Sequence, residues 1–190
     1  MFRSVIFCCL LPCVSLNAAD SQLADAAERK DRETVTRLLK QKTDLNAAQV
    51  DGTTALHWAA YNDDTELGLI LLDAGAKADP ENRYGLTPLY SACQNGNAVL
   101  VRALLKHGVD PDTSQQGEEA ILTAARTGSV EVVQALLKSG GRVESKDRRN
   151  QTALMWAAGG GHLAVVRWLV EEVGAAVDDR STHGVVGVLI

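Results

Sequence analysis

The chain has 190 residues, of which 46% are hydrophobic, 4% aromatic and 23% charged, with 16 glycines and 4 prolines. This apolar fraction supports a packed core and excludes a disordered or collagen-like chain. The formal net charge of −5 argues against nucleic-acid binding through a generally basic surface.

Residues 1–19 predict a secretory signal peptide. Arg3 supplies an early positive charge, an apolar run covers residues 5–16, and the small residues Ala18 and Ala19 precede the expected cleavage point. The run is shorter than the ~20 residues of a spanning helix, so no stable membrane span is expected. We expect an extracytoplasmic protein, periplasmic or secreted, if this segment is cleaved, and a cytoplasmic one otherwise.

The chain after residue 20 repeats itself. Aligned segments begin at Gly52, Gly85, Gly117 and Asn150, with starts 33, 32 and 33 residues apart, and a degenerate copy begins at Leu23. A period of ~20–50 residues is typical of stacked repeat architectures. The repeat domain therefore covers 20–182, with repeats close to 20–48, 49–81, 82–114, 115–146 and 147–180.

Each repeat carries two helical patterns. In the first, an apolar residue is followed at i+3 and i+4 by two small ones, as at Leu56, Ala59 and Ala60, which lets a neighbouring helix approach closely. In the second, large residues recur four apart, as at Val101 and Leu105, and form a stripe wide enough to pack on two neighbours. A glycine suited to a left-handed C-cap follows the second helix at Gly75, Gly108, Gly140 and Gly174.

These residues resemble the ankyrin repeat family. The family pattern Gly-x-Thr-Pro-Leu-His-x-Ala-Ala occurs at 52–60, with Ala55 for proline, and at 85–93, with Tyr90 for histidine. The resemblance covers about residues 20–180 and implies an all-α solenoid of stacked helix-loop-helix units with protruding β-hairpin loops. The sequence departs from the pattern at Glu119, which replaces a threonine, and by one inserted residue near Val173.

The two ends of the repeat array differ. The first copy is rich in charged residues, as a capping repeat must be, because its outer face meets water. After the last copy, residues 183–190 form an apolar tail or a truncated fifth turn. Three interpretations stay open: the tail folds back over the last repeat, the apolar end is exposed, or the chain is a shortened version of a longer protein.

The sequence offers little for catalysis. The four histidines occupy different repeat positions, and no zinc-protease, paired-cysteine or EF-hand motif is present. Three of the four cysteines fall within the first thirteen residues, and Cys93 replaces a buried alanine, so a disulfide framework is not expected. We assign no catalytic, cofactor-binding or metal-binding residue and expect a non-enzymatic protein. An enzyme using Cys93 or an unrecognised histidine site ranks last.

The remaining residues form a surface. Hairpin loops and first-helix ends commonly touch partners in this family, and aromatic and arginine side chains dominate binding energy. The candidate partner-binding residues are Trp58, Tyr61, Arg83, Tyr84, Arg126, Arg148, Arg149 and Trp156. The alternative is that the tryptophans pack between repeats and the charges are merely solvated.

Charge is expected to be polarised along this surface. Acidic residues lie toward its start, and basic ones lie toward its end. The acidic group is Asp51, Asp63 and Asp64, and the basic group is Arg126, Lys146, Arg148 and Arg149. We predict a non-enzymatic interaction scaffold whose concave face and hairpin tips bind a protein partner with an acidic segment. The alternative is a subunit that docks into a larger assembly through its uncapped C-terminal repeat.

Overall fold

The computed structural model describes residues 21–115 and 118–177. The predicted signal segment and the tail at 183–190 lie outside the described residues. Within them, five helix pairs follow one another: α1 (Gln22–Glu28) with α2 (Arg32–Lys40), α3 (Ala55–Tyr61) with α4 (Thr65–Asp73), α5 (Pro88–Gln94) with α6 (Ala98–Lys106), α7 (Ala120–Thr127) with α8 (Val130–Lys138), and α9 (Ala153–Gly159) with α10 (Leu163–Trp168).

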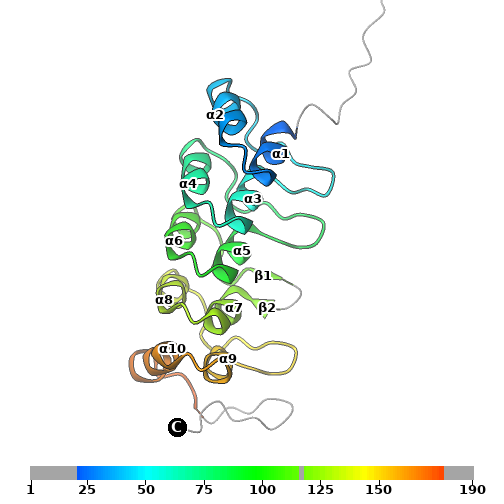
Figure 1. Ribbon diagram of the computed structural model, residues 1–190. Coiled ribbons are helices and arrows are strands. Elements are labelled where there is room, and N and C mark those ends of the chain that lie inside the picture. The colour runs from blue at the N-terminus through cyan, green and yellow to red at the C-terminus, as the bar shows by residue number, and fades with distance from the viewer. Residues whose placement is uncertain (1–20, 116–117, 178–190) are drawn as a thin grey trace, which may run out of the picture.

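The pairs stack in two layers. The odd-numbered helices form one layer, the even-numbered helices form the other, and the loops between repeats project beyond the odd-numbered layer (Figure 1). The structure confirms the predicted all-α solenoid of helix-loop-helix units. We call the surface formed by the loop tips and the exposed side of the odd-numbered helices the inner face.

Small residues allow the odd-numbered helices to pack closely. Each of these helices contacts the next one along the stack. The predicted small pairs are fully buried in the middle of the stack: Ala59 and Ala60, Ala92 and Cys93, Ala124 and Ala125. Because such short side chains fill little space, each helix depends on its neighbours for a dry environment.

The even-numbered helices begin at recurring N-caps. Four side chains at this position accept a hydrogen bond from the backbone N–H three residues later, which satisfies a donor that the first turn leaves unpaired. These pairs are Asp31 with Thr34, Asp64 with Leu67, Asn97 with Leu100, and Ser129 with Val132. The large residues of these helices then fill the space between the layers, with Leu71, Leu100, Leu104 and Leu136 fully buried.

The projecting loops are mostly tight turns. Only the third contains described strands, β1 (Ser114–Gln115) and β2 (Glu118–Glu119), which pair antiparallel. Elsewhere a short polar side chain accepts hydrogen bonds from backbone N–H groups of its own loop. Asn82 Oδ1, for example, accepts from Tyr84 and Leu86 at 3.0 Å each. Such side-chain bonds compete with strand pairing. In the fourth loop, Asn150 adopts a φ of 60°, which supports the tight turn expected there.

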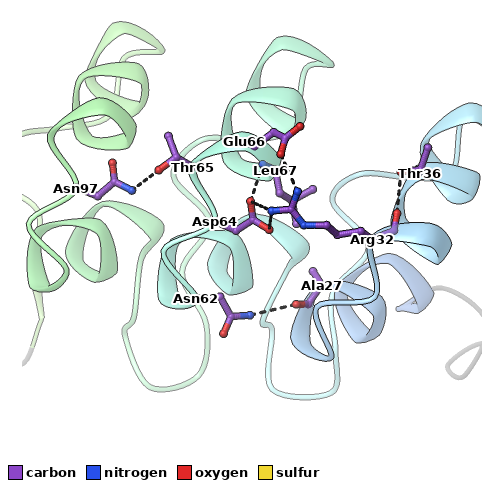
Figure 2. Close-up of polar contacts among 9 residues, drawn as sticks. All are labelled: Ala27, Arg32, Thr36, Asn62, Asp64, Thr65, Glu66, Leu67 and Asn97. Carbon is purple, nitrogen blue, oxygen red and sulfur yellow. Dashed lines mark hydrogen bonds and ion pairs between the residues drawn. The ribbon is translucent and has the colours of Figure 1, made fainter.

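Hydrogen bonds from one repeat to the previous one tie the stack together. A polar side chain at the end of each later odd-numbered helix, or within three residues after it, donates to a backbone carbonyl of the previous odd-numbered helix, and Figure 2 shows the first case. The bonds are Asn62 to Ala27 (3.1 Å), Asn95 to Ala60 (2.9 Å), Thr127 to Cys93 (3.4 Å) and His162 to Arg126 (2.7 Å). The Ala27, Ala60 and Cys93 carbonyls also accept a backbone N–H of their own turn, so the side chain from the next repeat is an additional donor to each of them.

The two departures from the repeat pattern have local structural solutions. Glu119 makes no side-chain cap for α7 and instead accepts hydrogen bonds from Ser145 Oγ and from Arg142 Nη2, which lie after α8 at the end of the same repeat. The inserted residue near Val173 is absorbed in a π-helical turn, η1 (Leu169–Val173), which follows α10 directly. A π turn holds one more residue than an α turn, so Gly174 still ends the repeat with a φ of 71°.

Candidate functional site

The inner face begins with a hydrogen-bonded cluster that fixes Trp58. The Trp58 Nε1–H donates to Gln49 Oε1 at 2.8 Å, and Gln49 Nε2 donates to Asp25 Oδ1 at 2.8 Å and to Glu28 Oε2 at 2.7 Å. The Tyr61 ring lies edge-on to the Trp58 ring, with centroids 5.6 Å apart. Trp58 is partly buried against the core, so it has both the packing role and the surface position considered from the sequence.

A hollow of about 220 Å³ opens beside this cluster, between the first two projecting loops. Trp58, Tyr61 and Tyr84 contribute aromatic rings to its lining, and Asp51 contributes a carboxylate. Tyr61 and Tyr84 keep 64% and 63% of their surfaces exposed. These two residues therefore remain available to a partner.

His57 forms part of the floor of this hollow. Its Nε2 lies 3.0 Å from the Leu86 carbonyl oxygen and so donates to it, while Nδ1 accepts the Thr54 backbone N–H at 3.1 Å. Burial lowers the pKa of His57, although the Leu86 carbonyl and the Asp51 carboxylate oppose this effect. The imidazole is therefore a neutral bridge between two repeats, in agreement with the structural role predicted for it.

A second cluster lies further along the inner face. The Arg126 guanidinium lies 5.8 Å from the centre of the Trp156 ring, and its Nη2 contacts Glu118 Oε1 at 3.3 Å. Trp156 is partly buried, and its Nε1–H is enclosed without an acceptor among the described residues. The structure thus brings Arg126 and Trp156 together, which sequence spacing alone did not predict.

Four of the predicted arginine and tyrosine residues lie at loop tips. Arg83 and Tyr84 share the second tip, and Arg148 and Arg149 share the fourth, all with exposed side chains. The Asp147 carboxylate braces the fourth turn by accepting the backbone N–H groups of Arg149 and Gln151, at 2.8 Å each. These tips are held in place before any partner arrives.

The acidic end of the face differs from the prediction. Asp63 and Asp64 lie in the turn between α3 and α4, at the opposite end of α3 from the projecting loops. Asp64 caps α4 and pairs with Arg32 at 3.4 Å, and Figure 2 shows Arg32 also reaching Glu66. Asp51 lies beside Trp58, on the face where it was predicted, and the other acids there are Asp25 and Glu28 instead of Asp63 and Asp64. Capping explains the difference, since an acidic side chain stabilises a helix N-terminus.

Gln49 was not predicted from the sequence to belong to the candidate site. Its side chain links three others on the inner face, although its own residue type carries no chemical signal. The repeat register could have found it, because Gln49 occupies the loop position of Asn82 and Asp147, which also bond within or between loops.

Cys93 is unsuited to nucleophilic chemistry. It is fully buried in α5, and burial raises the pKa of its thiol, so the reactive thiolate is disfavoured. In the part of the chain that the structure describes, no three His, Cys, Asp or Glu side chains gather as metal ligands would. None of the helices described there combines the length and apolar character needed to cross a bilayer.

Comparison with known proteins agrees with this architecture. The sequence matches the family described as ankyrin repeats (3 copies) over residues 23–115 and, overlapping, 108–181. The chain belongs to the ankyrin repeat family. Ankyrin repeats generally mediate protein–protein interaction, and the ankyrin repeat domain is typically non-catalytic.

Curated relatives match about half of the chain. The chain is 35% identical over 92 residues to tyrosine-protein kinase HTK16 of Hydra vulgaris, covering 47% of this chain and 12% of the kinase. It is 36% identical over 108 residues to ankyrin repeat, SAM and basic leucine zipper domain-containing protein 1 of Echinops telfairi, covering 54% and 23%. Rabankyrin-5 of Mus musculus is 36% identical over 86 residues, covering 45% and 7%. The chain therefore spans less than a quarter of each of these proteins.

Proposed function

We propose that this ankyrin repeat domain is a non-enzymatic scaffold that binds a protein partner along its inner face. The observation that carries the proposal is the distribution of exposed Tyr61, Tyr84, Arg148 and Arg149 on a stack whose loops are braced by hydrogen bonds. Because the loops are ordered beforehand, binding loses little conformational entropy.

The partner is expected to be oriented by charge. Asp25, Glu28 and Asp51 lie at the N-terminal end of the inner face, and Arg148 and Arg149 lie at the tip of the fourth loop. A partner segment with acidic residues at its end nearest the fourth loop complements this field, which raises the association rate and fixes direction.

The test compares two double variants of the full chain. Tyr84→Ala with Arg149→Ala removes one anchor from each end of the face, and each loss is expected to weaken capture about 30-fold. Val99→Ala with Arg102→Ala removes exposed side chains from α6, in the other layer, and serves as the matched control. Immobilised proteins are exposed to extract from the source cells, and captured proteins are quantified by mass spectrometry. Equal capture by the two variants would exclude the inner face.

A second candidate function is docking of the last repeat into an assembly. Leu163, at the start of α10, has 62% of its surface exposed, whereas Val130 at the corresponding position of α8 is partly buried against the core. Light scattering of Leu163→Glu, with Val99→Glu as control, distinguishes the two functions. Loss of a defined oligomer only in Leu163→Glu supports assembly, and a monomer in all three proteins excludes it.

We also propose export, on the basis of residues 1–19. The arrangement of Arg3, the apolar run and the small residues at 18 and 19 supports it. Intact mass measurement of the protein from its own cells tests this proposal. A chain starting at Asp20 supports export and an extracytoplasmic location, and a chain that retains residues 1–19 contradicts it.

A further inference from the structure

The hollow between the first two loops combines aromatic rings with a single carboxylate. Trp58, Tyr61 and Tyr84 supply the rings, and Asp51 is the lining residue with a formal charge. The other lining residues are threonine, asparagine, leucine, serine and the neutral His57. At about 220 Å³ the hollow is smaller than the ~300–1,000 Å³ of ordinary small-molecule sites, so it suits one side chain.

The rings are held in position without a ligand. Gln49 fixes the Trp58 indole through a 2.8 Å hydrogen bond, and Tyr61 meets Trp58 at an interplanar angle of 88°. The backbone N–H of Tyr84 bonds to Asn82 Oδ1 at 3.0 Å, and Asn82 Nδ2 bonds to Thr53 Oγ1 at 3.1 Å. The two loops that form the walls are therefore joined to each other, which lowers the entropic cost of binding.

Asp51 is held as an anion. Burial by itself would raise its pKa, but hydrogen bonds from the Thr53 backbone N–H, at 2.9 Å from Asp51 Oδ1, from the Thr53 side chain and from the Asp51 backbone together outweigh it, and the pKa is lowered. His57 contributes no positive charge to the hollow, since its Nε2–H is engaged by Leu86 and burial lowers its pKa. Arg83 shares a tip with Tyr84 but is not part of the lining.

We propose that this hollow, the cation pocket, binds a lysine or arginine side chain of the protein partner. The proposal rests on the scaffold function above and specifies one partner residue. A cation is attracted by the faces of the rings and by the Asp51 carboxylate. An acidic side chain would be repelled, and a neutral apolar one would strip water from the carboxylate without replacing it.

The cation pocket also defines the direction of the partner segment. Its basic residue lies between the first and second loops, and its acidic residues lie toward Arg148 and Arg149. A segment with the reverse order of charges places like charges together at both ends and is rejected.

The experiment uses the full chain and single amino-acid probes. The ¹⁵N-labelled protein is titrated with the Nα-acetyl amides of lysine, arginine, norleucine and glutamate, and the Trp58 indole signal, assigned with Trp58→Phe, is followed. Norleucine matches the lysine stem without its charge. We expect saturable shifts with lysine and arginine, and none with norleucine or glutamate at the same concentrations.

One variant removes the charge of the cation pocket, and a second variant changes an aspartate in a similar turn elsewhere as its control. Asp51→Asn keeps an acceptor for the Thr53 N–H but removes the charge, and it is expected to weaken lysine binding about five- to tenfold. Asp110→Asn alters an exposed aspartate whose Oδ1 accepts the Asp112 N–H at the same 2.9 Å, outside the pocket, and should bind like the unaltered chain. Equal shifts with norleucine, or unchanged affinity in Asp51→Asn, would overturn the proposal.

The result is independent of the capture experiment, because the probes need no partner. If lysine binds at Trp58 but the Tyr84 and Arg149 double variant captures its partner normally, the inner face is excluded as the capture surface, and the hollow stands only as a site for a basic side chain. If capture depends on the inner face and no probe binds, only the cation pocket fails.

Discussion

His57 shows how one side chain connects two repeats. Its two ring nitrogens are used in opposite senses: Nδ1 accepts from Thr54 at the start of α3, and Nε2–H donates to Leu86 in the next loop. This arrangement favours the neutral imidazole, because a second proton on Nδ1 would displace the Thr54 N–H bond and turn to the Thr54 hydroxyl oxygen, 2.9 Å away. The same histidine is thus a helix cap and a link between repeats.

We expect this preference to make stability depend on pH. The pKa of His57 is lowered in the folded state, chiefly by burial, so below about pH 6.5 the unfolded chain takes up a proton that the folded chain does not. The free energy of unfolding should therefore fall between pH 7 and pH 5, by at most about 1.4 kcal/mol per pH unit from this group. Urea unfolding at both pH values measures it.

The control for this prediction is a second histidine. His57→Gln should be less stable at pH 7 by about 1–3 kcal/mol, because buried hydrogen bonds are lost, but should show a smaller loss from pH 7 to pH 5. His107→Gln, which alters an exposed ring on the other layer, should keep the full pH dependence. An identical pH dependence in His57→Gln and the unaltered chain would contradict the assignment.

At the scale of elements, the junction between the last two repeats depends on a glycine. Gly128 ends α7 with a φ of 79°, and a Cβ built there would lie 2.4 Å from His162 Nδ1. His162 in turn bonds through Nε2 to the Arg126 carbonyl oxygen at 2.7 Å. The absence of a side chain at residue 128 thus lets the next repeat bind the end of α7.

Replacing Gly128 has two costs, the strain of a positive φ and the clash with His162, and Gly108 shows the first cost alone. It has a similar φ of 85°, but its Cβ would meet nothing within 4 Å. We expect Gly108→Ala to lower the free energy of unfolding by about 1 kcal/mol, for the backbone conformation alone, and Gly128→Ala to lower it by about 2–4 kcal/mol. Removing the ring with His162→Ala should reduce the difference, and equal effects of the two alanines would show that this contact is unimportant.

At the scale of the whole molecule, repeats are joined by ion pairs and by apolar packing, and these contribute differently to the free energy of unfolding. Arg32 forms an exposed ion pair with Asp64 and Glu66 of the next repeat (Figure 2). Leu100 of α6 is fully buried and packs on Gly68 of α4, where a Cβ would come within 2.7 Å of Leu100 Cδ1. Exposed ion pairs are screened by water and salt, whereas a cavity in a packed interface is not relieved.

We therefore predict that apolar packing, and not charge, holds the stack together. Leu100→Ala should lower the free energy of unfolding by about 2–5 kcal/mol. Arg32→Ala should leave the urea midpoint unchanged within error, at low and at high salt. A large salt-dependent loss of stability in Arg32→Ala would reverse this order of importance.

Much of the architecture was predictable because each repeat presents the same signals. The small pairs of the odd-numbered helices, the leucine-rich even-numbered helices and the glycines after them each recur at one spacing, and the structure confirms them. Asn150 in the left-handed region and Cys93 in the core were also predicted correctly. A departure from the pattern in one repeat does little harm to the prediction, because the other repeats carry the same pattern.

The contacts of the candidate site were less predictable. Asp63 and Asp64 are charged and sequence-adjacent to the inner face, yet capping and the Arg32 contact place them in the turn at the other end of α3. Gln49 gave no signal of its own and emerged as a central link. The Arg126 and Trp156 pair joins residues from two repeats, and a one-dimensional pattern does not give the distance between them.

The period, the helix pairs and the identity of the buried residues follow from the amino-acid sequence, because local propensity and apolar spacing act within each repeat. The exposed residues that face one another across repeats are known from the three-dimensional arrangement, since it sets the offset between successive units. The aromatic hollow beside Asp51 is such a feature, and it exists because two loops 33 residues apart are held side by side.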